Sequence, residues 1–521
     1  MILERSQVLW LGPAPTKTMF AEFERRRLKI TVTEGPLSDQ DFALSRAIVF
    51  SFDENKKGES IGHIQQYAPQ ASEHGLLVVV HANKVATERM LQGHIPSALV
   101  SDLPEEFERF NDFPRPHFSL KRPAHELAEL AARHPVGPYF SGPANLEVKG
   151  KHPEKQTDIF LLRRAFGDCR SISVSPLTKG LSGARVLVVY AEFPEGEAAP
   201  YPLPYFAKID TRKRILREFA AYDRFVSRYI PFGQRPNCEP KRCFVGLEDG
   251  ILVGDFVDDS VALSEIVKPA GARSTIHSLF DDALRGWRQQ AFYGDQRIPF
   301  SAIRSGIMDP DRIKSANFET ARRFGAGKTP KELTAVLDAV GTHDYRSGPV
   351  HGDLNTQNVR VRNGEAVLID FYKSRPGALA ADLASLEIAI CFSMEADTSW
   401  DLKDQEHYED SPRFKEWQRH VDKLFVFVAT KFGLVPPLQE QPCAHNWMWS
   451  ACRQLRLMAH YIEPNEEAYA NLLAAYLLRT AMFPENEKEL EPHTPNAIIR
   501  GYAYWCAERI LNAVASKKEA A

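Results

Sequence analysis

The Asn363-Gly364 pair restricts the local fold of this chain more than any other sequence feature. It lies between two short stretches rich in β-branched residues, within residues 350–387. Asn-Gly favours a two-residue hairpin turn because both residues tolerate positive φ. Such a hairpin brings its two flanks to the same end of a small ribbon. We therefore expect Asn358 and Asp370 to lie close together.

The residues around this ribbon suit phosphoryl transfer. His351-Gly-Asp353 stands before Asn358, and an Ile-Asp-Phe sequence contains Asp370. In phosphoryl transfer, one carboxylate orients the attacking hydroxyl and accepts its proton, while a carboxamide and a second carboxylate hold Mg²⁺ against the nucleotide phosphates. Asp353 is thus the candidate base, and Asn358 and Asp370 are the candidate Mg²⁺ ligands.

In this pattern the chain resembles the aminoglycoside phosphotransferase and choline kinase group, which are small-molecule kinases with the protein-kinase-like fold. Their catalytic loop is His-Gly-Asp followed by Asn at the same spacing, and their metal-binding strand ends in Ile-Asp-Phe or Ile-Asp-Trp. They then tend to show Gly followed by Asp-Leu-Ala. This chain has Gly377 and then Asp382-Leu383-Ala384 at these places. The resemblance implies transfer of the γ-phosphoryl group of ATP to a hydroxyl, with Mg²⁺. His351 is expected to support the loop through backbone hydrogen bonds.

Four departures separate the chain from protein kinases. Those enzymes have Arg between the His and the Asp and Lys two residues after the Asp, where this chain has Gly352 and Asn355. It also lacks a Gly after Asp370-Phe371 and an Ala-Pro-Glu segment. These differences disfavour control by activation-loop phosphorylation. A protein kinase acting on a partner polypeptide stays an alternative, because only Asn355 bears on the substrate class near the base.

Residues upstream fit the nucleotide-binding half of such an enzyme. Gly180 and Gly183 stand in a predicted turn between two strand-like runs, which suits a loop whose backbone amides approach phosphates. Lys208 is alone among apolar neighbours in a β-like run, where kinases keep the lysine that contacts the α and β phosphates. Glu218, in the helical pattern that follows, could pair with Lys208. The alternatives are an edge-strand lysine and an exposed helix carboxylate.

The resemblance covers residues 156–400 well and implies an α+β, protein-kinase-like bilobal phosphotransferase domain over residues 156–521. We expect its N-lobe at about 156–256 and a helical C-lobe at about 257–521. Seven prolines precede it within residues 113–155. Because proline removes a backbone donor and breaks helices, that segment is predicted to be a Pro-rich linker, interrupted by one short helical pattern at residues 124–134.

Residues 1–112 alternate short apolar runs with charged stretches of helical length. The runs occupy residues 6–12, 29–34, 46–52, 76–82 and 97–103. This pattern is typical of a parallel sheet with helices on both faces, and it predicts a flavodoxin-like α/β domain with a five-stranded parallel sheet. Five such units in about a hundred residues resemble the receiver domain of two-component response regulators.

The receiver resemblance weakens at its active site. A receiver needs an acidic cluster after its first strand and a Lys after its fifth, but the chain has Gly12-Pro-Ala and Leu103-Pro104 there. Only Asp53 stands where a phosphoacceptor could be, and we expect it to be a strand-end or capping residue. The domain is interpreted as a degenerate receiver that contacts a protein partner.

The charge balance gives no argument for a polyanionic partner. Lys plus Arg total 65 and Asp plus Glu total 68, for a net charge of −3, so neither nucleic acid nor an anionic membrane is expected as a partner. We find no signal peptide and no uncharged apolar stretch near the roughly 18 residues of a membrane span. Seven cysteines without a signal peptide argue against a disulfide scaffold. A cytoplasmic protein is the expectation.

Together these features predict a phosphotransferase that uses ATP and Mg²⁺ and phosphorylates a hydroxyl of a small molecule or partner, in a signalling or conflict system. The alternative from another class is a nucleotide-binding sensor whose receiver-like domain recruits a partner. The presence of Asp353, Asn358 and Asp370 favours catalysis, because a pure binder has no need of the base.

Overall fold

A computed structural model of the chain describes most of its residues. They are residues 5–82, 90–91, 93–96, 116–120, 123–134, 137, 147–150, 155–177, 184–193, 204–268, 272–395, 408–431, 446–483 and 494–520. They form two compact units. The first consists of Met1–Ala220 and Asn237–Asp258, and the second of Ala221–Pro236 and Asp259–Ala521.

The first sheet of unit 1 is parallel throughout. Its strands are β1 (Gln7–Leu11), β2 (Lys29–Thr33), β3 (Ser45–Ser51), β4 (Leu77–Ala82) and β5 (Pro116–Leu120), in the order β2-β1-β3-β4-β5. The first four strands match predicted runs. The fifth predicted run does not supply the fifth strand, and its residues lie outside the described part of the chain.

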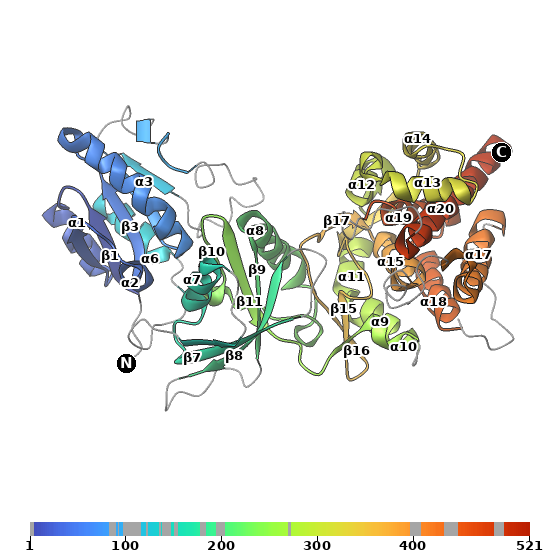
Figure 1. The fold of residues 1–521 in the computed structure, drawn as a ribbon, viewed down its shortest axis with the longest axis horizontal. Helices are drawn as coiled ribbons and strands as arrows, with labels where there is room; N and C mark the ends of the chain where they lie inside the picture. Colours follow the sequence, from blue (N-terminus) through green and yellow to red (C-terminus); the bar gives the residue numbers. More distant parts are fainter. Residues whose placement is uncertain are drawn as a thin grey trace. The chain divides into compact units, whose positions relative to one another are not determined.

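Helices cover both faces of this sheet (Figure 1). Helix α1 (Lys17–Arg25) and helix α6 (Ala124–Arg133) bury Phe23 and Leu127 with apolar residues of β1, β3 and β4. Helix α3 (Lys57–Glu73) packs on the opposite face, where α2 (Asp39–Leu44) contributes Phe42. The α/β architecture with helices on both faces is therefore confirmed, whereas the flavodoxin-like assignment stays a prediction.

The proline-rich segment 113–155, which we expected to be a linker, instead supplies regular structure to unit 1. It contains β5, α6 and β6 (Glu147–Gly150), and β6 joins the second sheet. Pro116 is the first residue of β5, and β5 is the edge strand of its sheet. An edge strand tolerates proline at its first position, so the prolines did not prevent pairing.

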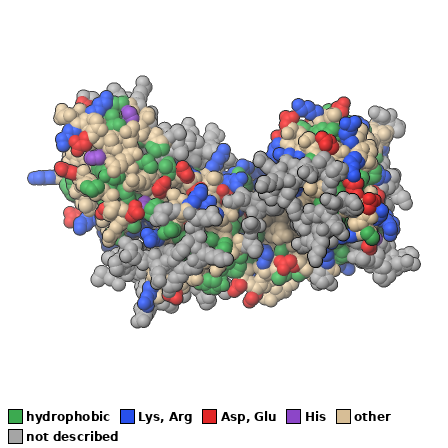
Figure 2. Space-filling model, viewed as in Figure 1, with side chains coloured by type: hydrophobic (Ala, Val, Ile, Leu, Met, Phe, Trp, Pro, Cys, Tyr) green, Lys and Arg blue, Asp and Glu red, His purple; other side chains and the backbone are tan. Residues whose placement is uncertain are grey.

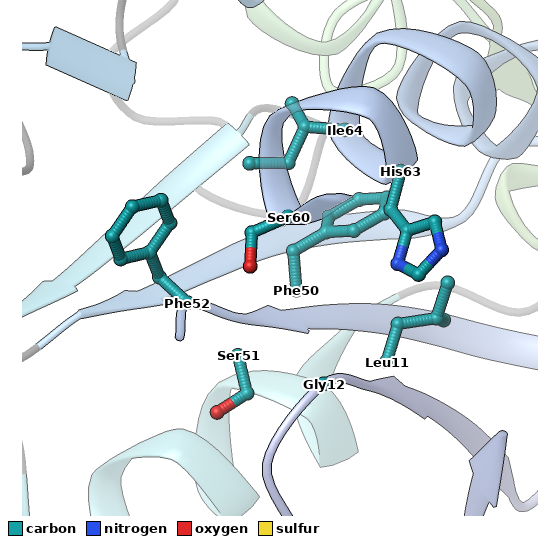
Figure 3. Close-up of a pocket in the computed structure, with 8 residues that line it drawn as sticks. All are labelled: Leu11, Gly12, Phe50, Ser51, Phe52, Ser60, His63 and Ile64. Atoms are coloured by element: carbon teal, nitrogen blue, oxygen red, sulfur yellow. The ribbon is translucent and has the colours of Figure 1, made fainter. Parts of the chain in front are cut away.

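A small pocket lies at the carboxyl ends of β1 and β3, beside α3 (Figure 3). Gly12 borders it with φ +100°, and a Cβ there would lie 2.0 Å from the Ser51 carbonyl oxygen. None of the described residues that line the pocket carries a carboxylate or an ammonium group. Asp53 lies next to this edge and accepts a hydrogen bond from Asn55 N at 2.9 Å, which confirms the expected capping role.

The second sheet of unit 1 has six strands and corresponds to the predicted N-lobe. Its order is β10-β11-β9-β8-β7-β6, antiparallel except for the β6–β7 pair. The remaining elements are α7 (Gln156–Ala165), β7 (Ser171–Pro176), β8 (Arg185–Glu192), β9 (Tyr205–Thr211), α8 (Arg212–Ala221), β10 (Phe244–Val245) and β11 (Asp249–Asp255). Helix α8 follows β9 directly, so residues of the two elements can pair.

Helix α7 joins the two sheets of unit 1. The rings of Phe160 and His74 lie 4.2 Å apart, and Arg164 Nη1 donates to the Ser45 carbonyl oxygen at 2.8 Å. Burial and the nearby Arg164 guanidinium lower the pKa of His74 to about 4. The imidazole of His74 is therefore neutral at pH 7, which suits its buried place between the N-terminal α/β layer and the second sheet.

Unit 2 is mainly helical and holds two small sheets, with strand orders β12-β15-β16 and β13-β14-β17. Their strands are β12 (Val261–Ala262), β13 (Arg297–Pro299), β14 (Asp344–Val350), β15 (Val359–Arg362), β16 (Glu365–Leu368) and β17 (Arg375–Ala378). The helices are α9 (Leu263–Ile266), α10 (Arg273–His277), α11 (Arg285–Gly294), α12 (Phe300–Ile307), α13 (Ser315–Arg323), α14 (Pro330–Val340), α15 (Ala380–Ile388), α17 (Pro412–Lys431), α18 (Asn446–Ile462), α19 (Glu466–Thr480) and α20 (Pro495–Ala520).

Shorter helical turns complete the chain. Turns of π-helix occur at Tyr222–Val226, Ser278–Ala283 and Ala389–Ser393, and 3₁₀ turns at Glu54–Lys56, Phe232–Gln234, Pro240–Arg242, Pro310–Arg312 and Tyr408–Asp410. Within the described residues, no helix combines the length and the apolar character needed to cross a bilayer. Basic and acidic side chains are interspersed on the face in Figure 2, in keeping with the balanced total charge.

Helix α15 is buried along its whole length and carries a charge in the core of unit 2. Glu387 Oε1 accepts from Arg456 Nη2 at 2.6 Å and Nε at 2.9 Å, and Tyr469 Oη donates to Oε2 at 3.0 Å. Glu387 and Arg456 are both fully buried. Each charge is therefore stabilised by the other and by its polar neighbours rather than by solvent.

Replacing Arg456 with Met should destabilise unit 2 by about 3–5 kcal/mol, because it leaves the Glu387 carboxylate buried without this counterion. The double variant Arg456→Met/Glu387→Gln should recover most of that loss. Lys331→Met, which removes an exposed pair with Asp311, should cost under about 1 kcal/mol. Urea unfolding of the three variants measures these differences, and equal losses for Arg456→Met and Lys331→Met would contradict this account.

Candidate active site

The predicted hairpin is present in unit 2. Strands β15 and β16 pair antiparallel around Asn363 and Gly364, whose φ values are +53° and +83°. Positive φ at both central residues is typical of the expected turn. The open end of the ribbon is closed by a bond from Ile369 N to the Asn358 carbonyl oxygen at 3.0 Å. Asn358 and the residue before Asp370 therefore meet at this end, as the sequence predicted.

A buried carboxylate holds the loop that precedes the hairpin. Asp382, in the first turn of α15, accepts from His351 N at 2.7 Å and from Gly352 N at 3.0 Å. Burial raises the pKa of Asp382 above its usual value, and His351 and the two backbone hydrogen bonds offset only part of that rise. The ring of His351 contacts the Ile369 carbonyl oxygen through Nε2 at 3.0 Å, which confirms its expected supporting role.

Asp353 lies between two cations. Its Oδ2 is 3.1 Å from Lys373 Nζ, and its Oδ1 accepts from Arg479 Nη2. Arg479 also donates through Nη1 to the Gly352 carbonyl oxygen at 3.2 Å. Burial alone would raise the pKa of Asp353, but Arg479 and Lys373 outweigh it and hold that pKa below its usual value. The candidate base is therefore a carboxylate that stays ionised.

The candidate metal ligands offer oxygen donors that fit Mg²⁺. Asn358 Nδ2 donates to the Asp353 carbonyl oxygen at 2.9 Å, which leaves the amide Oδ1 as the ligand atom. Asp370 has φ +62°, a conformation that a residue other than glycine keeps when its surroundings enforce it. In the described part of the chain there is no group of three or more His, Cys, Asp or Glu side chains suited to a metal. Two oxygen ligands fit an ion that keeps water and phosphate in its remaining positions.

Lys208 and Glu218 form the expected ion pair in unit 1. Nζ of Lys208, on β9, is 2.8 Å from Oε2 of Glu218, on α8, and both side chains are nearly buried. Strand β9 lies between β11 and β8, so Lys208 is not an edge-strand lysine, and Glu218 is not an exposed helix carboxylate. Gly180 and Gly183 lie outside the described residues.

Sequence reasoning missed the two cations at the candidate base. Lys373 is three residues after Asp370 in the same connection, so its charge near the loop was a usable signal. Arg479 is on α19, far along the chain from the loop, and only the packing of helices brings it there. The Asp-Leu-Ala motif is visible in the sequence, but the bonds from Asp382 to the loop become apparent only in the structure.

One family model matches the chain, that of ternary complex associated domain 9, over residues 313–467. That range contains the loop, the hairpin and Asp382, and it covers less than half of the chain. No curated protein matches.

Several solved structures are similar to the chain at low identity. Aminoglycoside phosphotransferase APH(3'')-Id from Streptomyces rimosus is 17% identical, with 58% of this chain and 99% of that chain covered and a TM-score of 0.30. A thermostable mutant of aminoglycoside phosphotransferase APH(4)-Ia with ADP and hygromycin B is 14% identical, with 68% of this chain and 97% of that chain covered and a TM-score of 0.32. A glucosamine kinase is 11% identical, with 67% of this chain and 94% of that chain covered and a TM-score of 0.32. At such TM-scores the likeness does not establish what this chain does, so function must be argued from its own residues.

Gly352 should be the less tolerant of two glycines with similar backbone conformation. Its φ is +74°, and a Cβ would lie 2.5 Å from the Lys373 carbonyl oxygen, whereas Gly364 has φ +83° and open space around it. Both Ala substitutions cost about 1–2 kcal/mol of backbone strain, and Gly352→Ala adds about 1–3 kcal/mol from the clash. Urea unfolding compares the two variants, and an equal loss of stability would contradict the close packing of this loop.

Proposed function

We propose that this protein is an ATP-dependent phosphotransferase that moves the γ-phosphoryl group to a hydroxyl of a small molecule. The observation that carries the proposal is the arrangement at the open end of the β15–β16 ribbon. There, a carboxylate (Asp353) and a carboxamide (Asn358) share one loop, and a second carboxylate (Asp370) follows the returning strand. Phosphoryl transfer needs these three groups, a base and two oxygen ligands for the metal.

In the proposed reaction each residue has one role. Asp353 orients the acceptor hydroxyl and takes its proton, and Asn358 and Asp370 hold Mg²⁺, which neutralises charge on the phosphates. Lys208 contacts the α and β phosphates, and Glu218 orients Lys208 through the 2.8 Å ion pair. Gly180 and Gly183, which lie outside the described residues, stay the candidates for backbone contacts with the phosphates.

A nucleotide sensor is the second candidate, and one observation favours it. Asp353 is paired with both Lys373 and Arg479, and a carboxylate with a lowered pKa is a weaker base. In that case the N-terminal α/β domain would contact a protein partner while the nucleotide stays intact. Incubation with ATP, Mg²⁺ and pooled acceptors, followed by mass spectrometry for added phosphate, separates the two candidates.

Asp353→Asn should separate nucleotide binding from turnover. The amide keeps the size of the side chain but cannot take the hydroxyl proton, so phosphoryl transfer should fall about 100-fold or more while Mg·ATP affinity stays within a few fold. Where no acceptor is identified, slow ATP hydrolysis is the rate to measure. Asp311→Asn, at an exposed carboxylate, is the control and should change neither quantity.

The result that would replace the enzyme with the sensor is tight ATP binding by the unaltered protein with neither transfer nor hydrolysis across a broad acceptor screen. An Asp353→Asn variant that turns over at the original rate would instead remove Asp353 from the role of base and leave the enzyme class standing.

Asp370→Asn should weaken nucleotide binding only when Mg²⁺ is present. The substitution removes the charge of the second metal ligand and keeps its shape, so the affinity for Mg·ATP should fall about 10-fold or more. Binding of ATP in the presence of a chelator should be unchanged. Calorimetry with and without Mg²⁺ measures both affinities, and an equal Mg·ATP affinity for variant and unaltered protein would exclude Asp370 as a ligand.

A further inference from the structure

The two cations at Asp353 are held in different ways. Arg479 has a side chain only 8% exposed, bonds to both Asp353 and the Gly352 carbonyl oxygen, and lies 5.6 Å from the rings of Tyr476 and Phe483. Lys373 has a side chain 36% exposed and reaches Asp353 with its terminal ammonium. Arg479 is therefore held in place against the loop, whereas Lys373 can turn about its side-chain bonds.

The ion pair with Lys373 occupies the oxygen that the proposed reaction needs. Arg479 already takes Oδ1 of Asp353, and Lys373 takes Oδ2 at 3.1 Å. Each carboxylate oxygen keeps a second lone-pair site, but the ammonium at Oδ2 competes with an acceptor hydroxyl for that oxygen and lowers its basicity. Asp353 is therefore a better base when Lys373 pairs with another anion.

The transferring phosphoryl group is the anion that fits. Asp353, Lys373 and Arg479 together carry one negative and two positive charges, and the nearby Asp370 adds a negative charge that a bound metal ion would offset. Lys373 stands three residues after the proposed metal ligand Asp370 and interacts electrostatically with it. A phosphate bound to a metal ion at Asp370 would therefore lie near the ammonium group of Lys373.

The residue that protein kinases use near the base is not available here. Where they have a lysine, this chain has Asn355, and its side chain is engaged within the loop. Asn355 Oδ1 accepts from Gln357 N at 2.9 Å and Asn358 N at 3.0 Å, and Nδ2 donates to the Asp353 carbonyl oxygen at 3.2 Å. Asn355 therefore stabilises the loop and has no charge to offer a phosphate, whereas the ammonium of Lys373 lies on the other side of Asp353.

We propose that Lys373 is a catalytic residue whose ammonium group binds the γ-phosphate of ATP and so releases Oδ2 of Asp353 for the acceptor hydroxyl. This inference rests on the proposed function. The acceptor oxygen forms a bond to the γ phosphorus, the bond between that phosphorus and the bridging oxygen breaks, and ADP leaves with the electron pair. The hydroxyl proton goes to Asp353, and Lys373 stays protonated throughout.

The test compares two nucleotides that differ by the group Lys373 would bind. Calorimetry with Mg²⁺ measures the affinities for ADP and for AMP-PNP, an ATP analogue that resists transfer. Lys373→Met should lower the AMP-PNP affinity about 10- to 100-fold, the range of a lost charge-assisted hydrogen bond, and leave the ADP affinity unchanged. Lys373→Arg should restore most of the difference, and Lys331→Met, at an exposed lysine, should change neither affinity.

Each result bears on one claim. If the unaltered protein binds neither nucleotide, the proposed function is overturned and this inference falls with it. If it binds both, and Lys373→Met lowers both affinities equally or neither, then Lys373 only stabilises the loop and this inference is overturned while the proposed function stands. Should Lys373→Met fail to fold, judged by circular dichroism, Lys373→Gln serves in the same comparison.

Turnover gives an independent reading. With any acceptor that the screen identifies, Lys373→Met should lower kcat by a much larger factor than it raises the KM for the acceptor. The reason is that the phosphate contact strengthens as charge develops on the transferring group. A variant with unchanged kcat would overturn the catalytic role.

Discussion

The buried carboxylate of Asp382 positions the loop that carries the candidate base in unit 2. It accepts the backbone N–H groups of His351 and Gly352, the two residues before the candidate base. His351 in turn contacts the Ile369 carbonyl oxygen at the end of the ribbon. One side chain on α15 therefore fixes the loop, and the loop fixes the hairpin. Without it, two buried backbone donors would lose their partner, at a cost of about 1–3 kcal/mol each.

The same helix carries a second buried acid, Glu387, and the two carboxylates have different kinds of hydrogen-bond partner. Asp382 bonds to backbone N–H groups, which keep their positions, whereas Glu387 depends on Arg456 and Tyr469 from α18 and α19. The hydrogen bonds of Asp382 fix the conformation of a loop, and those of Glu387 fix the positions of α18 and α19 relative to α15. Because Arg479 also comes from α19, the packing that satisfies Glu387 sets the place of the cation at Asp353. The core and the candidate site are therefore linked through one helix pair.

Local chemistry explains what the sequence could predict. The Asn363-Gly364 turn and the Lys208–Glu218 pair each follow from residues close along the chain, and both are present. Arg479 could not be found this way, since its contact with the loop depends on tertiary packing between distant segments. The strand that begins at Pro116 was not predicted, because a proline count does not reveal that a strand lies at the edge of its sheet. The roles of the site residues stay predictions, and so does the phosphate contact of Gly180 and Gly183.

Gly352, which stands where protein kinases have arginine, and Lys373, which pairs with the candidate base, depend on the same close backbone packing. A side chain at Gly352 would meet the Lys373 carbonyl oxygen at 2.5 Å, so the backbone of Lys373 lies directly against the loop. A Cβ at position 352 would force this backbone to shift, and the same close approach carries the ammonium of Lys373 to within 3.1 Å of Asp353. A larger residue at 352 would push away the segment that supplies the cation. The absence of the kinase arginine is therefore a condition for a lysine that reaches the base from the strand side of the loop.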